Sequence, residues 1–293
     1  MTNPQIFDHN RIEQFRRRAF TRYGQKGDFL LVRMAEDLEE RLQTVDRKFT
    51  RAVDLFGHTG VGSKVLEKSG KVATVDVVES DRRYMNGTHK FLKRGREFID
   101  LPIEHYDLVI SLLSLSITND VPGVLTQIRK SLKPDGLFLG VMSGAGTLGE
   151  LRESMLQAET ELYGGASPRV YPFADIRDAG GLLQRAGFAM PVSDVENLTV
   201  RYNTAFDLMG DLRAMGMQNA LIGRSRRPVT KHFFERVAEI YAERFCDPDG
   251  RIRASFSFIW LSGWAPDKNQ QKPLRPGTAK ISLIDVLGDK SSH

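Results

Sequence analysis

The stretch Ala52–Glu67, AVDLFGHTGVGSKVLE, decides the fold of this chain. Its opening residues, Ala52–Leu55, predict a short buried strand, and Gly57, Gly60 and Gly62 predict a turn from which a helix begins. In an open α/β sheet, ligands bind beyond the carboxyl ends of the strands. Glycines at such a place let the backbone approach a ligand closely, because they carry no Cβ atom. The stretch therefore predicts a strand–turn–helix unit that holds a ligand.

Strands and helices alternate on both sides of this stretch. Before it, two amphipathic helices are predicted over residues 11–23 and 28–43. After it we expect strands over 72–75, 107–113 and 137–142, helices over 80–92 and 120–132, and a turn over 133–136. Asp120 and Pro122 are typical of an N-cap and a first helical turn. Because parallel strands need crossovers, the alternation predicts a Rossmann-like α/β fold, with a mainly parallel sheet and helices on both faces.

The second half of the chain is predicted to be mainly helical. Helices are expected over 147–162, 173–186, 204–215 and 230–245, the first opened by a capping box of Thr147 and Glu150. Residues Ile252–Trp260 alternate between apolar and polar, which predicts a half-buried antiparallel strand near the C-terminus. We therefore expect three parts: helices over 1–50 that cover the ligand site, a ligand-binding domain over 51–265 with a helical insertion at about 147–245, and an extension over 266–293.

Composition and charge narrow the class of protein. The 293 residues are 41% hydrophobic and 27% charged, and no apolar run approaches the roughly 18 residues that a membrane span requires. Cys246 is the single cysteine, so we expect a reducing compartment, and with no signal-like segment after Met1 we expect a cytoplasmic protein. The six histidines lack metal-ligand spacing, so no metal site is expected.

The net charge of +5 includes two arginine clusters, at residues 16–22 and 224–227. We interpret them as solvated surface, with an anionic partner such as RNA, an acidic protein or a membrane surface as the alternative. Neither cluster is interleaved with the aromatic residues that single-strand binders use for stacking.

The acids beside the turn indicate the charge of the ligand. Asp76 follows the turn at the distance where a carboxylate can accept both hydroxyls of a ribose. A nicotinamide dinucleotide site would share that acid, but it needs the order G-x-G-x-x-G and no carboxylate beside the pyrophosphate. Here Asp54 precedes the turn, which favours a cationic ligand. A purely structural role for either acid, as a cap of the turn or of the next helix, remains open.

These residues resemble the motifs of class I S-adenosylmethionine (SAM)-dependent methyltransferases. Asp54–Gly60 resembles the first motif, D-x-G-x-G-x-G, and residues 106–111 and 132–136 resemble two later motifs of biotin-synthesis and ubiquinone-synthesis methyltransferases. The resemblance implies a class I methyltransferase fold with SAM as the cofactor. It implies that the cofactor is bound around Asp54, Phe56, Gly57, His58, Gly60, Asp76, Val77, Asp100 and Ser111.

A narrower resemblance covers nearly the whole chain. It is to respiratory complex I assembly factors of this fold and their alphaproteobacterial relatives, and it lies in residues 6–8, 113–120, 147–152, 158–161, 167–168, 182–187 and 270–279. The mitochondrial member of that family is a SAM-binding arginine hydroxylase acting on a complex I subunit. The chain departs from the family pattern at Phe56 and His58, which replace the first two motif glycines, and at Ser116-Ile117, where the family often has His-Trp.

The sequence thus predicts a SAM-dependent methyltransferase of a small molecule or a protein. In-line methyl transfer depends mainly on holding donor and acceptor aligned, so no catalytic residue is predicted. Ser114–Ile117 stands where nucleic-acid amino methyltransferases carry Asn/Asp-Pro-Pro-aromatic, so nucleic acid is not the expected substrate. Two alternatives stay open: a SAM-binding arginine hydroxylase or assembly factor for respiratory complex I, and a binding module with a degenerate methyltransferase fold.

Overall fold

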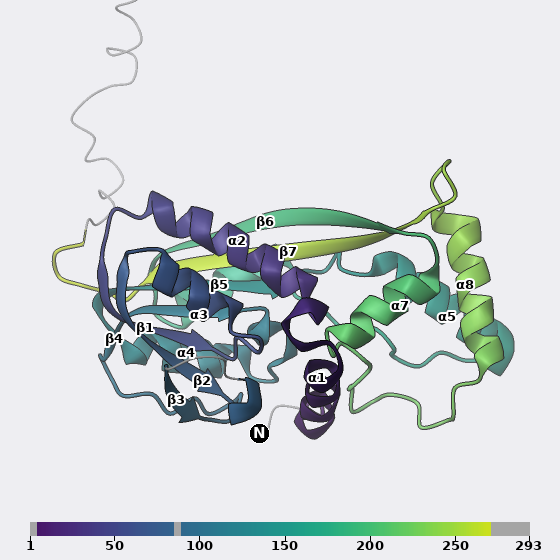
Figure 1. Ribbon diagram of the computed structural model, residues 1–293, viewed down its shortest axis with the longest axis horizontal. Helices are drawn as coiled ribbons and strands as arrows, with labels where there is room; N and C mark the ends of the chain where they lie inside the picture. Colours follow the sequence, from purple (N-terminus) through teal and green to yellow (C-terminus); the bar gives the residue numbers. More distant parts are fainter. Residues whose placement is uncertain (1–4, 85–88, 271–293) are drawn as a thin grey trace, which may run out of the picture.

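The computed structural model describes residues 5–84 and 89–270. Its seven strands form one sheet, in the order β3-β2-β1-β4-β5-β7-β6 (Figure 1). The strands are β1 (Phe49–Leu55), β2 (Val72–Glu79), β3 (Lys90–Lys93), β4 (Tyr106–Leu112), β5 (Leu132–Ser143), β6 (Ala189–Tyr202) and β7 (Ile252–Trp264). The first five pair in parallel, and β7 pairs antiparallel with both β5 and β6. The predicted fold class, mainly parallel with an antiparallel strand near the C-terminus, is confirmed.

Helices cover both faces of the sheet. They are α1 (His9–Tyr23), α2 (Phe29–Thr44), α3 (Val61–Lys68), α4 (Val121–Ser131), α5 (Gly149–Tyr163), α6 (Ile176–Arg185), α7 (Ala205–Ala214) and α8 (Lys231–Phe245). Two hydrophobic cores lie on opposite faces: α2 and α3 pack over one, and α4 and α6 over the other. The first core continues beyond the parallel strands, where β6 and β7 carry α5, α7 and α8 (Figure 1).

Several helices begin where the sequence predicts. Asp120 accepts a hydrogen bond from Gly123 N at 3.0 Å and caps α4, as expected. Asp28 caps α2 in the same way, through Leu31 N at 3.2 Å. In α2 the predicted apolar stripe is buried, and it attaches this helix to the sheet beside the glycine turn.

The helix predicted over 80–92 is wrong within the described residues. The chain makes a short 3₁₀ turn at Arg82–Tyr84, and β3 then pairs in parallel with the last four residues of β2. Residues 85–88 lie outside the described residues. The open edge of β2 offers unpaired backbone donors and acceptors, and pairing with them outweighs the weak helical pattern.

Strand β6 was not expected from the sequence. The predicted helical insertion at 147–245 therefore contains a fourteen-residue strand of the central sheet. Its neighbour β7 is also more buried than predicted, because it lies between β5 and β6, and Phe256–Leu261 are buried on both faces.

Two turn signals act differently from the prediction. Thr147 and Glu150 do not form a capping box: α5 begins at Gly149, and both side chains instead bind the backbone of β7, at Ser257 and Ser255. The turn expected at 133–136 lies inside β5 as an irregularity in its pairing, with Asp135 at φ 60°. Of the predicted extension, residues 271–293 lie outside the described residues.

No helix within the described residues is long and apolar enough to cross a bilayer.

Candidate functional site

The glycine turn joins β1 to α3 at the carboxyl edge of the sheet. Phe56 N donates a hydrogen bond to Val78 O at 2.8 Å, so the turn starts alongside the end of β2. Three of its residues adopt left-handed φ angles: Phe56 at 55°, His58 at 51° and Gly60 at 73°. Only glycine adopts this region without strain, so the backbone keeps the shape of a glycine-rich loop although two of the positions carry side chains.

Asp54 is the buried acid beneath this turn. Its side chain is fully buried, and neither carboxylate oxygen has a hydrogen-bond partner among the described residues. A Cβ atom on Gly57 would overlap that carboxylate, so glycine is required at 57 by contact with Asp54. Burial, with the nearby charge of Glu79, raises the pKa of Asp54 to about 7. A buried carboxylate without a donor is a ready acceptor for a cationic or hydrogen-bond-donating ligand.

Glu79, rather than Asp76, is the acid at the end of β2, because the strand runs four residues beyond its predicted end. Glu79 is buried and accepts hydrogen bonds from His58 N at 2.7 Å and Ser80 N at 3.0 Å. Val77 pairs with Asp54, so Val77 and Glu79 face the same side of the sheet as Asp54.

Asp76 faces the opposite side of the sheet, because successive side chains of a strand alternate. Its carboxylate accepts a hydrogen bond from the Tyr106 hydroxyl at 3.0 Å, among the residues of the second core. The structure thus separates Asp76 from Asp54 and the turn. Sequence reasoning did not single out Glu79, which directly follows the apolar pair Val77-Val78.

The side chains of Phe56 and His58 lie where the motif has glycines. The Phe56 ring is buried, with the Arg96 guanidinium 4.9 Å from its centroid. The His58 ring is buried against Tyr84, at 4.6 Å between centroids, and neither ring nitrogen has a hydrogen-bond partner among the described residues. Burial, with the positive charges of Arg16 and Arg96, holds the pKa of His58 well below its ordinary value, so the ring is neutral.

The N-terminal helices cover the turn. Arg16 on α1 and Asp28 before α2 both line the same cavity as His58. One Arg16 guanidinium nitrogen, Nη1, is buried without a hydrogen-bond partner, and burial raises the pKa of Asp28 to about 6. The arginine cluster at residues 16–22 is predicted to be solvated. Arg16 instead turns inward, whereas Arg17 and Arg18 are exposed.

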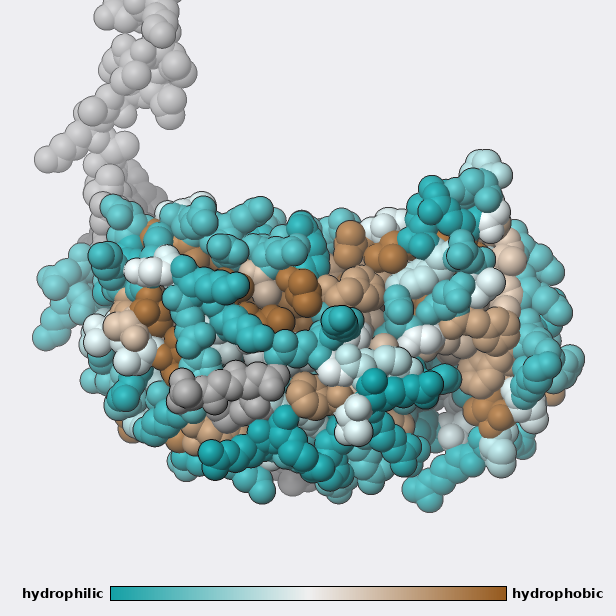
Figure 2. Space-filling view, in the orientation of Figure 1, coloured by the Kyte–Doolittle hydropathy of each residue, from teal (hydrophilic) through white to brown (hydrophobic). Residues whose placement is uncertain are grey.

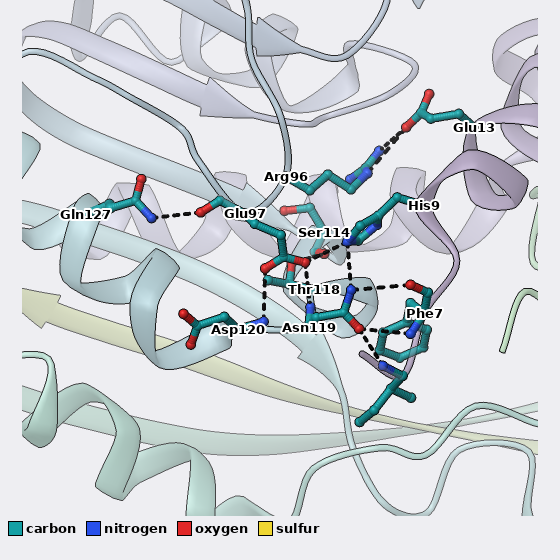
Figure 3. Close-up of polar contacts among 11 residues, drawn as sticks. Phe7, His9, Glu13, Arg96, Glu97, Ser114, Thr118, Asn119, Asp120 and Gln127 are labelled. Carbon is teal, nitrogen blue, oxygen red and sulfur yellow. Dashed lines mark hydrogen bonds and ion pairs between the residues drawn. The ribbon is translucent and has the colours of Figure 1, made fainter. Parts of the chain in front are cut away.

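A network of polar contacts fastens the N-terminal segment to the loop after β4 (Figure 3). Asn119 Oδ1 accepts hydrogen bonds from Ile6 N and Phe7 N, both at 2.8 Å, and its Nδ2 donates to Phe7 O at 3.3 Å. Glu97 accepts from Asn119 N at 2.8 Å and Asp120 N at 2.9 Å, and contacts His9 Nε2 at 2.6 Å. The segment, the loop and Glu97 thus form one unit at the edge of the site.

Two further predicted residues lie apart from the turn. Ser111, near the end of β4, is buried and hydrogen-bonded to Ser114 at 2.6 Å between hydroxyl oxygens. The Asp100 side chain is 87% exposed, in the loop after β3. The less exposed acid of that loop is Glu97, which is half-buried and which sequence reasoning did not single out.

Two cavities meet at His58, which lines both. The smaller, of about 260 Å³, holds four of the other predicted residues together with Glu79: Asp54, Gly57, Gly60 and Val77. The larger, of about 700 Å³, lies between the N-terminal helices and the carboxyl ends of β1, β4 and β5, and it includes Phe56, Leu113 and Ser116. No group of three or more possible metal ligands gathers within the described part of the chain.

Comparison with known proteins places this geometry in a family. The model of a methyltransferase domain matches residues 15–191, which run from within α1 through the glycine turn and the parallel strands to the start of β6. The chain belongs to this methyltransferase family. Its fold is likewise similar to a putative methyltransferase from Bacillus halodurans, with a TM-score of 0.55 at 13% identity over 79% of this chain and 98% of that one.

Two kinds of curated relative resemble this methyltransferase-family chain. The mitochondrial arginine-hydroxylase NDUFAF5 of Rattus norvegicus is 34% identical over 92% of this chain and 80% of its own length. The malonyl-[acyl-carrier protein] O-methyltransferase of Halorhodospira halophila is 28% identical over 92% of this chain and 94% of its own length. Relatives of this methyltransferase therefore carry two different activities on one fold.

The donor set of the methyltransferase site fits SAM, which carries a sulfonium, an amino group, a carboxylate and a ribose diol. Asp54 offers a buried carboxylate without a partner, Glu79 is the acid at the end of β2, and Arg16 offers an unpartnered guanidinium nitrogen. The side chains of Phe56 and His58 narrow the space above the turn. The charges of the site are complementary to those of the cofactor. The rings of Phe56 and His58 limit the space available to the cofactor.

Proposed function

We propose that this chain is a SAM-dependent methyltransferase that binds the cofactor across the two cavities joined at His58. The observation that carries the proposal is Asp54, a buried carboxylate without a hydrogen-bond partner beneath a loop of glycine-type shape. Asp54 and Glu79 favour the cationic and diol ends of the cofactor, and Arg16 favours its carboxylate. Gly57 and Gly60 let the backbone come close.

The chemistry asked of the protein is mainly alignment. SAM supplies a methyl group on a sulfonium, and in-line transfer is promoted by holding the acceptor close and correctly oriented. In this chain the larger cavity is the proposed acceptor site, because it lies at the ends of β4 and β5 beside the turn. Asp28 lines it, and with its pKa raised to about 6 by burial it is placed to take the proton that a methylated oxygen or nitrogen loses.

The N-terminal helices, residues 1–50, act in this proposal as the cover of the cofactor site. Arg16 and Asp28 reach the cavity from them, and the contacts of Asn119 fasten the segment before α1. We also propose a reducing compartment such as the cytoplasm, because Cys246 is an exposed free thiol.

The decisive experiment is a calorimetric titration of the full chain with SAM, using the two acids of β2 as a matched pair. We expect binding by the wild type and at least tenfold weaker binding by Glu79→Gln, a loss of about 1.4 kcal/mol or more. Asp76→Asn should bind as the wild type, because Asp76 faces the other side of the sheet. The reverse ranking would restore Asp76 as the ribose-binding acid.

A complete lack of SAM binding by the wild type would remove the enzyme proposal. It would favour the alternative of a binding module with a degenerate methyltransferase fold, which Phe56 and His58 motivate.

A second candidate is a SAM-binding arginine hydroxylase, favoured by the 34% identity to relatives of that name. A respiratory complex I subunit is its candidate partner. Incubation with SAM and candidate acceptors, followed by mass spectrometry, separates the two: methyl transfer adds CH₂ to the acceptor, and hydroxylation adds one oxygen atom.

A further inference from the structure

A second large cavity adjoins the proposed acceptor site. It has a volume of about 810 Å³ and lies between α5, α7, α8 and the segment 168–173. Tyr171, Phe173 and Met217 line both this cavity and the larger cavity at the turn, so the two share a wall. In Figure 2 hydrophobic patches are visible between α7 and α8, among hydrophilic surface, at the same end of the molecule. We call this cavity the methionine chamber, after Met155, Met209 and Met217 in its lining.

The lining of the methionine chamber suits an apolar chain. Besides the three methionines it consists mainly of Leu148, Leu151, Val170, Phe173, Leu212 and Phe234. Methionine side chains are flexible and polarizable, so they adapt to ligands of varied shape. Mainly apolar walls that bind a ligand, with a few polar groups that orient it, are the usual lining of a small-molecule site.

Two polar side chains of the chamber are available to a ligand, one exposed and one with a buried oxygen atom. Arg213 lines the chamber but is exposed to solvent, and its side chain makes no hydrogen bond or ion pair with a described residue; Gln218 Oε1 is buried without a hydrogen-bond donor. Arg169, in contrast, is already paired with Glu159 at 2.5 Å. Among the described residues that line the chamber, the exposed guanidinium of Arg213 on α7 is therefore the positive charge that an anionic group can pair with without breaking an existing ion pair.

We infer that the methionine chamber binds the apolar chain of an acceptor that ends in a carboxylate, with the carboxylate at Arg213. The chain then runs along the methionines towards the wall formed by Tyr171, Phe173 and Met217, and a hydroxyl or amide on it donates to Gln218 Oε1. The inference rests on the proposed function, since an acceptor has to reach the adjoining cavity for methyl transfer. It narrows the substrate to an amphipathic carboxylic acid.

The test uses dodecanoate as the probe and the full chain, by calorimetric titration without SAM. We expect dodecanoate to bind about tenfold more tightly than dodecanol or dodecyltrimethylammonium. Arg213→Gln should lose that preference. Arg185→Gln is the matched control, because Arg185 is exposed on α6 and lies outside the chamber, and it should leave binding unchanged.

Filling the chamber tests its location. Met155→Trp on α5 and Met209→Trp on α7 each place a large ring in the cavity, and each should weaken dodecanoate binding at least tenfold. Two variants from different helices keep the test valid if one fails to fold, which a thermal melt detects. Equal binding by both folded Trp variants and the wild type would overturn the inference, as would equal binding of dodecanol and dodecanoate.

The SAM titration of the same variants keeps the two proposals apart. Loss of dodecanoate binding with unchanged SAM binding is the expected result for Met155→Trp. If the wild type binds SAM but not dodecanoate, the chamber inference fails and the proposed function stands. If it binds dodecanoate but not SAM, the chamber is a ligand site and the proposed function fails.

Discussion

His58 holds a left-handed backbone that glycine would adopt freely, and its ring separates the two cavities of the site. A residue other than glycine in this conformation costs about 1 kcal/mol or more. His58→Gly removes both the strain and the ring. We expect at least tenfold tighter SAM binding by calorimetry, because the cofactor no longer has to displace a buried side chain.

His58→Asn is the matched intermediate. Asparagine tolerates the left-handed region and is smaller than histidine, so its SAM affinity should fall between wild type and His58→Gly. Weaker binding by His58→Gly would show instead that the imidazole contacts the cofactor.

The raised pKa of Asp54, about 7, makes SAM binding depend on pH. Below this value the free protein holds a protonated Asp54, and a cationic ligand has to displace the proton. The dissociation constant for SAM should therefore fall about tenfold per pH unit as the pH rises from 5.5 to 7, and it should stay constant above pH 7. Titrations in buffers of different ionisation enthalpy should register release of a proton.

Asp54→Asn serves as the control for that profile. It should bind SAM weakly and with a flatter pH dependence, because the titrating group is gone. An equally steep profile in the variant would assign the effect to Glu79, whose pKa burial also raises.

At the residue scale the sequence names much of this candidate site. It places Asp54, Gly57, Gly60 and Val77 together, and it marks Phe56 and His58 as departures. It names Asp76 and does not single out Glu79, although each follows a run of β-branched residues at a suitable distance. The choice depends on where β2 ends relative to β1, and that register is a tertiary property.

The segment before α1 depends on one side chain after β4 (Figure 3). Asn119→Ala removes three hydrogen bonds to the backbone of Ile6 and Phe7. We expect a loss of about 1.5–4.5 kcal/mol in the free energy of unfolding, since each of the three bonds contributes about 0.5–1.5 kcal/mol. Hydrogen exchange should be faster at residues 6–9 in particular. Asn197→Ala, at an exposed position of β6, should change neither measurement.

Local patterns explain which elements were predictable. The helices α1, α2, α4, α7 and α8 carry apolar stripes or caps that stand out in the sequence. In β6 the apolar residues lie on both faces, with Val192 and Val195 exposed and Leu198 half-buried, so the period of two is blurred. β3 has only four residues, and only pairing with β2 makes it a strand.

Buried carboxylates make the stability of the whole molecule depend on pH. Burial raises the pKa of Asp28 to about 6 and that of Asp54 to about 7, above their unfolded values near 4. Because the folded state binds these protons more tightly, their contribution to stability is full below about pH 4 and is lost as pH rises through 6 and 7. For the double variant Asp28→Asn/Asp54→Asn we compare the free energy of unfolding with that of the wild type at each pH. The difference in favour of the variant should be larger at pH 8 than at pH 5, by about 2 kcal/mol or more.

Urea unfolding of the ligand-free proteins at the two pH values measures this difference. Comparison with the wild type at each pH cancels the opposite effect of His58, which is neutral when folded but gains a proton on unfolding below about pH 6.5. If the difference in free energy of unfolding between the double variant and the wild type were the same at both pH values, this would contradict the raised pKa values.

The position of β7 between β5 and β6 sets the order in which the chain can assemble during synthesis. β6 ends at Tyr202, but the strand that joins it to the sheet begins only at Ile252. At a translation rate of about 5–20 residues per second, β6 and the outer edge of β5 wait about 3–10 seconds for their partner. The parallel half around the glycine turn can form earlier, so a ribosome-bound nascent chain exposes two unpaired β edges that invite chaperone binding or aggregation.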